Sequence, residues 1–384
     1  SHEGRVVPIS TATDTVIAAQ APIELGPIAN AGFNSNGKLA PAPGQVPAVA
    51  SVNPQTFNTA TGAFPNQLAS IALRPNKALA YVVSTGASPN GPLRLNSNVQ
   101  GLVSVINTNT GLEFTAAQTD LLERRTAPLN LNQGVNLATS PEPKLFFSNP
   151  VAIAWRPNGA DAWIACQQAD AIVRLTVDGS NVPGIGAPLV AGPSQITRVD
   201  LLEVEDGEIP GKAPRGIAID AAGEHAYVYN YISRSITVVD ITNGQNPVIV
   251  ATVRSSKLPK PGSAKGRIQL GAELFFTGRG PEERMSSEAW GSCASCHPDG
   301  NADGVTWMFP TGPRQTIGLE GMFDRDNPHD QRILNWSAVQ DENPDFELNT
   351  RGVFAGRGLI DDDRLFLAFG GRNVGNGKDN LEVE

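Results

Sequence analysis

The sequence predicts two parts, an all-β body followed by a smaller, mainly α-helical segment. A strand repeat recurs along the first two thirds of the chain. From about residue 261 the alternating apolar pattern gives way to apolar residues at helical spacing. Charged residues make up 17% of the chain, well below the usual quarter or so, and 39 Gly and 30 Pro supply the turns of a many-stranded body.

The repeat consists of three segments, 68–84, 150–166 and 214–230, which align without gaps over their first half. Each holds an alternating apolar strand, a polar turn and a second strand, and a third strand follows. Alternation with a period of two is typical of antiparallel strands. The aligned residues are Ile71, Ile153 and Ile217 in the first strand and Tyr81, Trp163 and Tyr227 ten positions later in the second.

A repeat of about 40 residues built from short strands predicts the blades of a β-propeller. The segments, above all "AYVYNYISRSITVVDITNG" at 226–244, resemble the YVTN family of β-propellers, and residues 5–23 resemble the last half of another blade. We therefore expect YVTN-like blades over residues 1–256. About three and a half blades are recognisable, whereas propellers close with roughly four to eight. Either two long insertions, 24–65 and 108–148, hide strands, or the chain is part of a longer protein, which we favour.

Two residues of the body that could carry chemistry are expected to be structural. Cys166 falls in a predicted strand, where a free Cys packs as a small apolar residue. His225 lies beside a turn of the third segment.

The strongest chemical signal is "GSCASCHPDG", residues 291–300. Cys293, Cys296 and His297 form C-x-x-C-H, the spacing of covalent haem c attachment. Two thiols at this spacing can add to the two vinyl groups of one porphyrin, and the adjoining His can ligate its iron. The motif therefore predicts one covalently bound haem c.

Three other interpretations of the motif fit less well. A zinc site usually combines two such pairs, and the sequence has neither a second Cys pair nor a His cluster. A thioredoxin-like redox pair is expected to follow a strand in a βαβ unit, and this context lacks that pattern. A disulfide across two intervening residues closes too small a loop to stabilise the chain much.

The residues around the motif have the pattern of small helices and loops. Residues 257–266 form a natural linker, and an apolar helical face follows at Ile268, Leu270, Leu274 and Phe275. We therefore expect a mainly α c-type cytochrome domain at 267–384.

The pattern "GAELFFTGR…SCASCH…GPRQT" resembles the N-terminal haem domain of the bacterial di-haem cytochrome c peroxidase and MauG-like family. The resemblance implies thioether anchors at Cys293 and Cys296 and a proximal iron ligand at His297. Members of this family carry a second C-x-x-C-H in a domain where peroxide or an oxidised intermediate is handled. The printed sequence has no second motif, so we expect any second haem in further polypeptide or missing domains.

The sixth ligand of the iron has several candidates. The resemblance implies a position just before the Gly-Pro-Arg, and residues 304–314 hold Met308 and no His. Met308 is therefore the first choice and His329 the second, with Met322 or an open site as further alternatives. Thioether ligation raises the reduction potential relative to two His ligands and suits electron transfer. The alternative for Met308 is a core position beside Trp307.

Several residues near the motif have open roles. Arg314 and Arg332 either pair with haem propionates through their planar guanidinium groups or serve solubility. Trp307 either passes electrons at the haem edge or only packs against the porphyrin. Calcium is a further candidate cofactor, because related di-haem enzymes bind it and residues 340–347 offer oxygen ligands. Residues 299–304 resemble the start of a calcium loop but lack the final Glu of an EF-hand.

Net charge and hydropathy bear on nucleic-acid binding and on membrane insertion. The net charge of −9, with no basic run, argues against nucleic acid. No stretch of about 18 apolar residues occurs, so the sequence predicts no transmembrane segment.

These observations predict an extracytoplasmic c-type cytochrome with a propeller as docking domain. Its redox partner would be a protein or a small electron carrier. Because haem c is attached outside the cytoplasm, we expect a periplasmic, extracellular or cell-surface protein whose signal peptide has been removed. Two alternatives remain. The chain is part of a di-haem peroxidase or MauG-like oxidase, or it is a surface or assembly propeller protein with a structural haem.

Overall fold

The computed structural model describes most of the body and the surroundings of the motif. The described residues are 4–17, 21–26, 63–89, 93, 95–114, 129–132, 146–185, 196–281, 284–309, 312–322, 324, 326–327, 346–354, 356 and 358.

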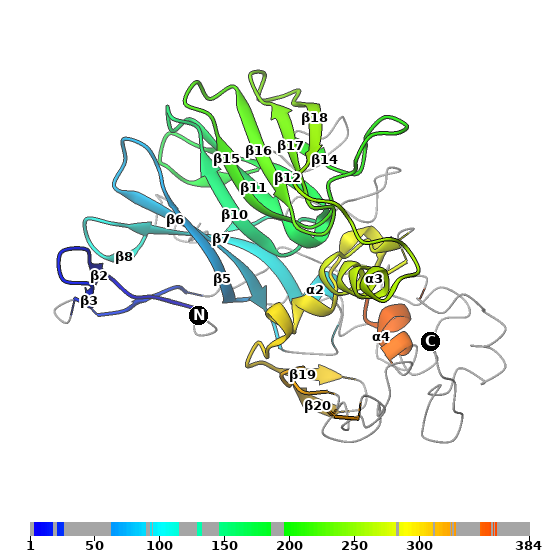
Figure 1. Ribbon diagram of the computed structural model, residues 1–384. Coiled ribbons are helices and arrows are strands. Elements are labelled where there is room, and N and C mark those ends of the chain that lie inside the picture. Colours follow the sequence, from blue (N-terminus) through cyan, green and yellow to red (C-terminus); the bar gives the residue numbers. More distant parts are fainter. Residues whose placement is uncertain are drawn as a thin grey trace, which may run out of the picture.

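Three antiparallel sheets form the body, and each runs up and down in chain order (Figure 1). The first contains β5 (Phe64–Leu73), β6 (Leu79–Ala87), β7 (Val99–Asn107) and β8 (Leu112–Glu113), with β9 (Leu129–Asn130) also paired to β7. The second contains β10 (Pro150–Trp155), β11 (Asp161–Cys166), β12 (Ala171–Val177) and β13 (Pro183–Gly184), with β14 (Arg198–Asp200) also paired to β12. The third contains β15 (Pro214–Ile219), β16 (His225–Asn230), β17 (Ser235–Asp240) and β18 (Val248–Arg254). The first strands β5, β10 and β15 lie side by side, which is the arrangement of propeller blades.

The strand pairing follows the sequence repeat in all three sheets. The Ile of each first strand pairs with the residue directly after the aromatic residue of the second strand. The pairs are Ile71 with Val82, Ile153 with Ile164 and Ile217 with Val228. The three aromatic residues therefore occupy the same face of their sheets, because side chains alternate along a strand.

This shared face packs against the next sheet in two of the three copies. Tyr81 contacts Trp155 of the second sheet, with ring centroids 4.7 Å apart. Trp163 is fully buried against Val228 and other residues of the third sheet. Tyr227 is 42% exposed, and no further sheet of four or more strands follows within the described chain.

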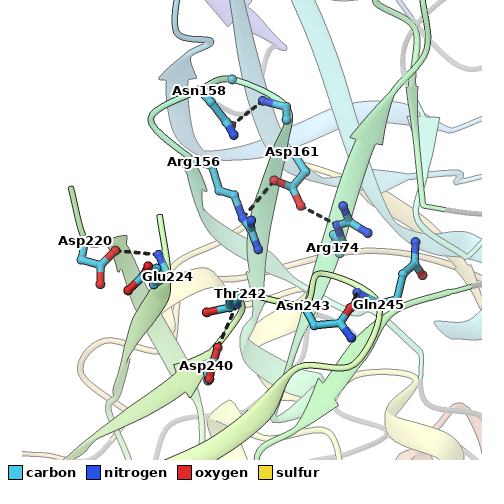
Figure 2. Close-up of polar contacts among 12 residues, drawn as sticks. Arg156, Asn158, Asp161, Arg174, Asp220, Glu224, Asp240, Thr242, Asn243 and Gln245 are labelled. Atoms are coloured by element: carbon cyan, nitrogen blue, oxygen red, sulfur yellow. Dashed lines mark hydrogen bonds and ion pairs between the residues drawn. The ribbon is translucent and has the colours of Figure 1, made fainter. Parts of the chain in front are cut away.

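Short polar side chains close the turns of the blades (Figure 2). Asn158 accepts a hydrogen bond from the backbone N–H of Ala160, and Asp220 accepts one from Glu224. Such Asx turns let the chain reverse direction within a few residues. The buried carboxylate of Asp161 forms ion pairs with an arginine on either side in the second sheet, which are Arg156 and Arg174.

Cys166 and His225 both belong to blade strands. Cys166 ends β11, and its side chain is fully buried, which raises the pKa of its thiol. The Nδ1 atom of His225 lies 2.9 Å from a carboxylate oxygen of Asp220, across the turn that joins β15 to β16.

The first residues of the chain form two small ladders rather than a four-stranded sheet. β1 (Arg5–Val6) pairs with β4 (Ile23–Glu24), and β2 (Ile9–Ser10) pairs with β3 (Thr15–Val16). Ile23 and Leu25 pack against Ala80 and Val82 of β6. The segment thus covers part of the other face of the first blade.

The rest of the described chain contains short helices and one hairpin (Figure 1). The body itself includes α2 (Leu95–Asn98) and η2 (Gln167–Ala169). The later elements are α3 (Ala264–Phe276), η4 (Ser287–Ala289), η5 (Cys293–Ser295), η6 (Pro298–Gly300), β19 (Thr306–Phe309), β20 (Gly312–Gln315) and α4 (Glu347–Gly352). The described chain is mostly β with few helices. No helix in this part is long and apolar enough to cross a membrane.

α3 begins inside the range predicted as a linker. The hydroxyl of Ser263 caps it by accepting the backbone N–H of Gly266 at 3.0 Å. The helix and the loop after it bind the blades through ion pairs. Arg279 donates to both carboxylate oxygens of Asp200 at 2.7 Å, and Lys212 pairs with Glu273.

The residues after α3 also share a hydrophobic core with the body. Leu95 and Phe146 of the body pack with Trp290, Trp307 and Val353 in a single cluster. The segment that carries the motif is therefore built directly onto the first two blades.

Candidate functional site

The C-x-x-C-H motif forms a tight turn. Ser292 caps η5 together with Ser295, whose hydroxyl accepts the backbone N–H of Ser292 at 3.2 Å. The backbone N–H groups of Cys296 and His297 then both donate to the carbonyl oxygen of Cys293. Ser295 also donates to the side chain of Gln168 at 2.8 Å, which fixes the turn against the second blade.

All three motif side chains line one cavity of about 320 Å³. Small-molecule and cofactor sites have volumes of roughly 300–1,000 Å³ and are mostly apolar. The walls come from the motif turn, the end of α3, the β19–β20 hairpin and the segment after it, α4, and one residue of the body. The apolar lining residues are Leu93, Phe275, Trp307, Phe309, Ile317, Leu319, Met322, Phe346, Val353 and Phe354.

The ring of His297 is oriented by a backbone carbonyl. Its Nδ1 atom lies 2.9 Å from the carbonyl oxygen of Ile317. Since a carbonyl only accepts, Nδ1 carries the hydrogen and Nε2 keeps its lone pair. Burial lowers the pKa of His297, so the ring is neutral at pH 7. A histidine that donates one N–H to a backbone carbonyl has the usual arrangement of a metal ligand.

The two cysteines are free thiols, not thiolates. Burial raises the pKa of Cys293 to about 11. Burial also raises the pKa of Cys296, and the nearby carboxylate of Asp303 adds to the effect. Redox-active cysteines and those that bind zinc need a thiolate, which a lowered pKa favours. These thiols lack that property but remain available for addition to a vinyl group.

Asp303 and Trp307 form a buried pair beside the motif. Trp307 is 3% exposed and lines the cavity. Its Nε1–H donates to one carboxylate oxygen of Asp303 at 2.9 Å, and the other oxygen accepts the backbone N–H of Val305. Sequence reasoning considered Asp303 only as part of a calcium loop, because no local pattern marks an aspartate that will be buried against an indole.

Arg314 supplies the permanent positive charge among the described lining residues. Its guanidinium lies 5.0 Å from the ring centroid of Phe309, within the range of a cation–π contact. Partial burial lowers the pKa of Arg314, which stays protonated at pH 7.

The structure describes the side chain of only one of the three candidates for the distal ligand. Met322 lines the cavity. Met308 holds the β19 position opposite Pro313, and its side chain lies outside the described part. His329 and Arg332 also lie outside the described residues.

The carboxylates considered for calcium have other partners. Asp299 forms an ion pair with Arg215 on the third blade, whereas Asp303 binds Trp307. Residues 340–345 lie outside the described part. In the described chain no group of three or more His, Cys, Asp and Glu residues is placed to hold a metal ion.

Sequence reasoning missed most of the cavity wall. Leu93 comes from the loop between β6 and β7, about two hundred residues before the motif. Asn349, Thr350 and Val353 come from α4 and its end, after a stretch of chain that carries no motif. Nothing in their local pattern distinguishes them from ordinary packing residues.

The comparisons with known proteins leave the family open. No family model matches the chain, and no curated protein matches it. Among solved structures, it is similar to a functionally unknown protein from Desulfotomaculum acetoxidans DSM 771, with 14% identity over 67% of this chain and 65% of that chain and a TM-score of 0.34. It is also similar to a protein from Lactobacillus plantarum, with 12% identity over 66% and 52% and a TM-score of 0.37. A third is the periplasmic gluconolactonase of Pseudomonas aeruginosa, with 12% identity over 68% and 54% and a TM-score of 0.36.

The fold is propeller-like. The chain spans less than two thirds of the length of each of these three structures. With TM-scores below 0.5, the likenesses add nothing to the blade topology described above.

Proposed function

We propose that this protein is an extracytoplasmic c-type cytochrome that exchanges single electrons with a redox partner. One observation carries the proposal. The C-x-x-C-H turn lies in the wall of an apolar cavity, and the same turn presents two protonated thiols and a neutral imidazole whose Nδ1 is oriented by the carbonyl of Ile317. This donor set suits a covalent haem, which needs two thioether bonds and one nitrogen ligand.

Cys293, Cys296 and His297 fit the three bonds that a covalent haem c requires. Each thiol of Cys293 and Cys296 would add across one vinyl, so that a C–S bond forms and the thiol hydrogen passes to the neighbouring carbon. Neither addition requires an oxidant. His297 would hold the iron through Nε2 while Ile317 keeps its ring oriented. Bound haem supplies an iron that alternates between the ferric and ferrous states.

The remaining wall residues would hold the porphyrin and keep water out. Trp307, Phe309 and Phe354 offer aromatic surface for the macrocycle. Arg314 offers a guanidinium to a propionate, since its planar fork matches a carboxylate. The cavity wall includes Leu93 of the first blade, so the propeller would contribute to the haem site, and its loops would serve as the docking face. The partner would be a redox protein or a small electron carrier.

A second candidate is a peroxidase-like oxidase of the di-haem family that the motif region resembles. Polar side chains in the cavity wall favour it. Gln315 and Asn349 have amide groups in the cavity wall that could hydrogen-bond a peroxide molecule there. In this case a second haem would lie in polypeptide beyond the printed chain. A haem that no donor reduces at a useful rate would instead favour a surface or assembly role.

The test is to produce the chain in a bacterial periplasm with haem c attachment machinery. We expect a chain whose mass includes one haem that survives denaturation. Replacing both motif cysteines with Ala should remove it, whereas Cys166→Ala should not, because Cys166 is buried in β11 away from the cavity. A chain matured in this way without haem absorption bands would refute the proposal.

The absorption spectrum then separates the first two candidates. A low-spin ferric spectrum and a ferrous form indifferent to carbon monoxide mean that protein fills both axial positions, which supports electron transfer. A high-spin ferric form that binds carbon monoxide once reduced, together with turnover of peroxide, supports the oxidase.

A further inference from the structure

The segment after the hairpin, residues 316–322, wraps around the motif turn. The backbone N–H of Thr316 donates to Val305, which extends the β19–β20 ladder. The carbonyl of Ile317 holds His297, and the N–H of Leu319 donates to the carbonyl of Gly300 at 2.7 Å. Within four residues, the segment thus forms hydrogen bonds with the hairpin, with His297 and with η6.

A turn directly after these contacts brings the chain back to the cavity. Gly321 has a φ of +63°, a left-handed conformation that favours glycine. The next residue, Met322, lines the cavity together with His297. Ile317, whose carbonyl holds His297, and Met322 therefore line the same cavity five residues apart along the chain.

The thioether sulfur of Met322 is a suitable ligand for haem iron. The other described side chains of the wall with unshared electron pairs, outside the motif, offer hydroxyl or amide groups, from Ser292, Thr316, Thr350, Gln315 and Asn349. A neutral thioether is an established axial partner of histidine in cytochromes c, whereas hydroxyl and amide groups are not.

The first-choice ligand from the sequence has a different position. Trp307 and Phe309 of β19 both line the cavity. Met308 holds the strand position between them, opposite Pro313, and its side chain lies outside the described part of the chain.

We infer that Met322 is the distal axial ligand of the haem. This inference rests on the proposed function. The protein would then supply one nitrogen and one sulfur ligand to the iron, an arrangement with a higher reduction potential than ligation by two histidines. It also closes the iron to exogenous ligands and therefore favours electron transfer over peroxide turnover.

The experiment compares the haem-loaded wild-type chain with Met322→Leu and, as the matched control, Met308→Leu. Both replacements keep side-chain size and remove only the thioether. The ferric wild type is expected to show the near-infrared charge-transfer band of methionine-ligated haem. Met322→Leu should lose this band completely and bind carbon monoxide when reduced, whereas Met308→Leu should keep the band.

A second variant separates ligation from packing. Met322→His should restore a low-spin spectrum without the near-infrared band and lower the reduction potential, which a residue that merely packs would not do. If the haem-loaded Met322→Leu protein keeps the band, or if Met308→Leu loses it, the inference is wrong while the proposed function stands. A matured wild-type chain that carries no haem overturns both.

Discussion

Two aromatic residues at the same repeat position should differ sharply in their contribution to stability. Trp163 and Tyr227 occupy equivalent positions in the second and third blades, opposite Ala154 and Ala218. Trp163 is fully buried by the third blade, whereas Tyr227 is 42% exposed. We expect Trp163→Ala to destabilise the protein far more than Tyr227→Ala.

The expected magnitudes follow from burial. Truncating a buried Trp to Ala typically costs about 3–5 kcal/mol. In the described structure the buried Nε1–H of Trp163 has no hydrogen-bond partner, and its removal relieves roughly 1 kcal/mol. The net cost of Trp163→Ala is therefore about 3 kcal/mol. Tyr227 keeps almost half of its surface in water, so its truncation should cost about 1 kcal/mol.

The assay is urea unfolding of both variants, followed by circular dichroism. With a slope of about 3 kcal/mol per molar urea, Trp163→Ala should lower the midpoint by about 1 M and Tyr227→Ala by about a third of that. Equal shifts would refute the reasoning. They would mean that the Tyr227 face of the third blade is covered in solution as thoroughly as the Trp163 face of the second.

Two further predictions concern buried carboxylates. Asp303→Asn keeps an acceptor for the indole of Trp307 but removes a negative charge beside the haem motif. The ferric state carries more positive charge than the ferrous state, so the reduction potential should rise; an unchanged potential in a redox titration would contradict this. Burial raises the pKa of Asp170 from 3.8 to about 7, so the folded chain holds a proton there that the unfolded chain has lost. Its contribution to stability is complete below about pH 4 and is lost as the pH rises through 7, so stability should fall across this range and Asp170→Asn should flatten the fall. Unfolding free energies at pH 4.5 and 7.5 measure the effect, and parallel curves for the two proteins would rule out Asp170 as its source.

The antiparallel strands of the repeat could be predicted from the sequence because they depend on local pattern. Alternation along each strand and the fixed spacing from Ile to aromatic residue set which residues pair. Their burial could not be predicted from the same pattern. Tyr81 and Tyr227 are equivalent in register, yet the first is fully buried and the second is exposed, because burial depends on the sheet that packs above.

The sequence by itself determined the three blades and the motif of Cys293, Cys296 and His297, since short-range spacing carries both signals. Only the tertiary structure decided what surrounds the motif. The carbonyl that orients His297, the indole of Trp307 that Asp303 binds and the thioether of Met322 meet at the cavity. Leu93 joins them from a blade loop far away in the chain. Such contacts depend on how hydrophobic surfaces pack together, and no local periodicity encodes that packing.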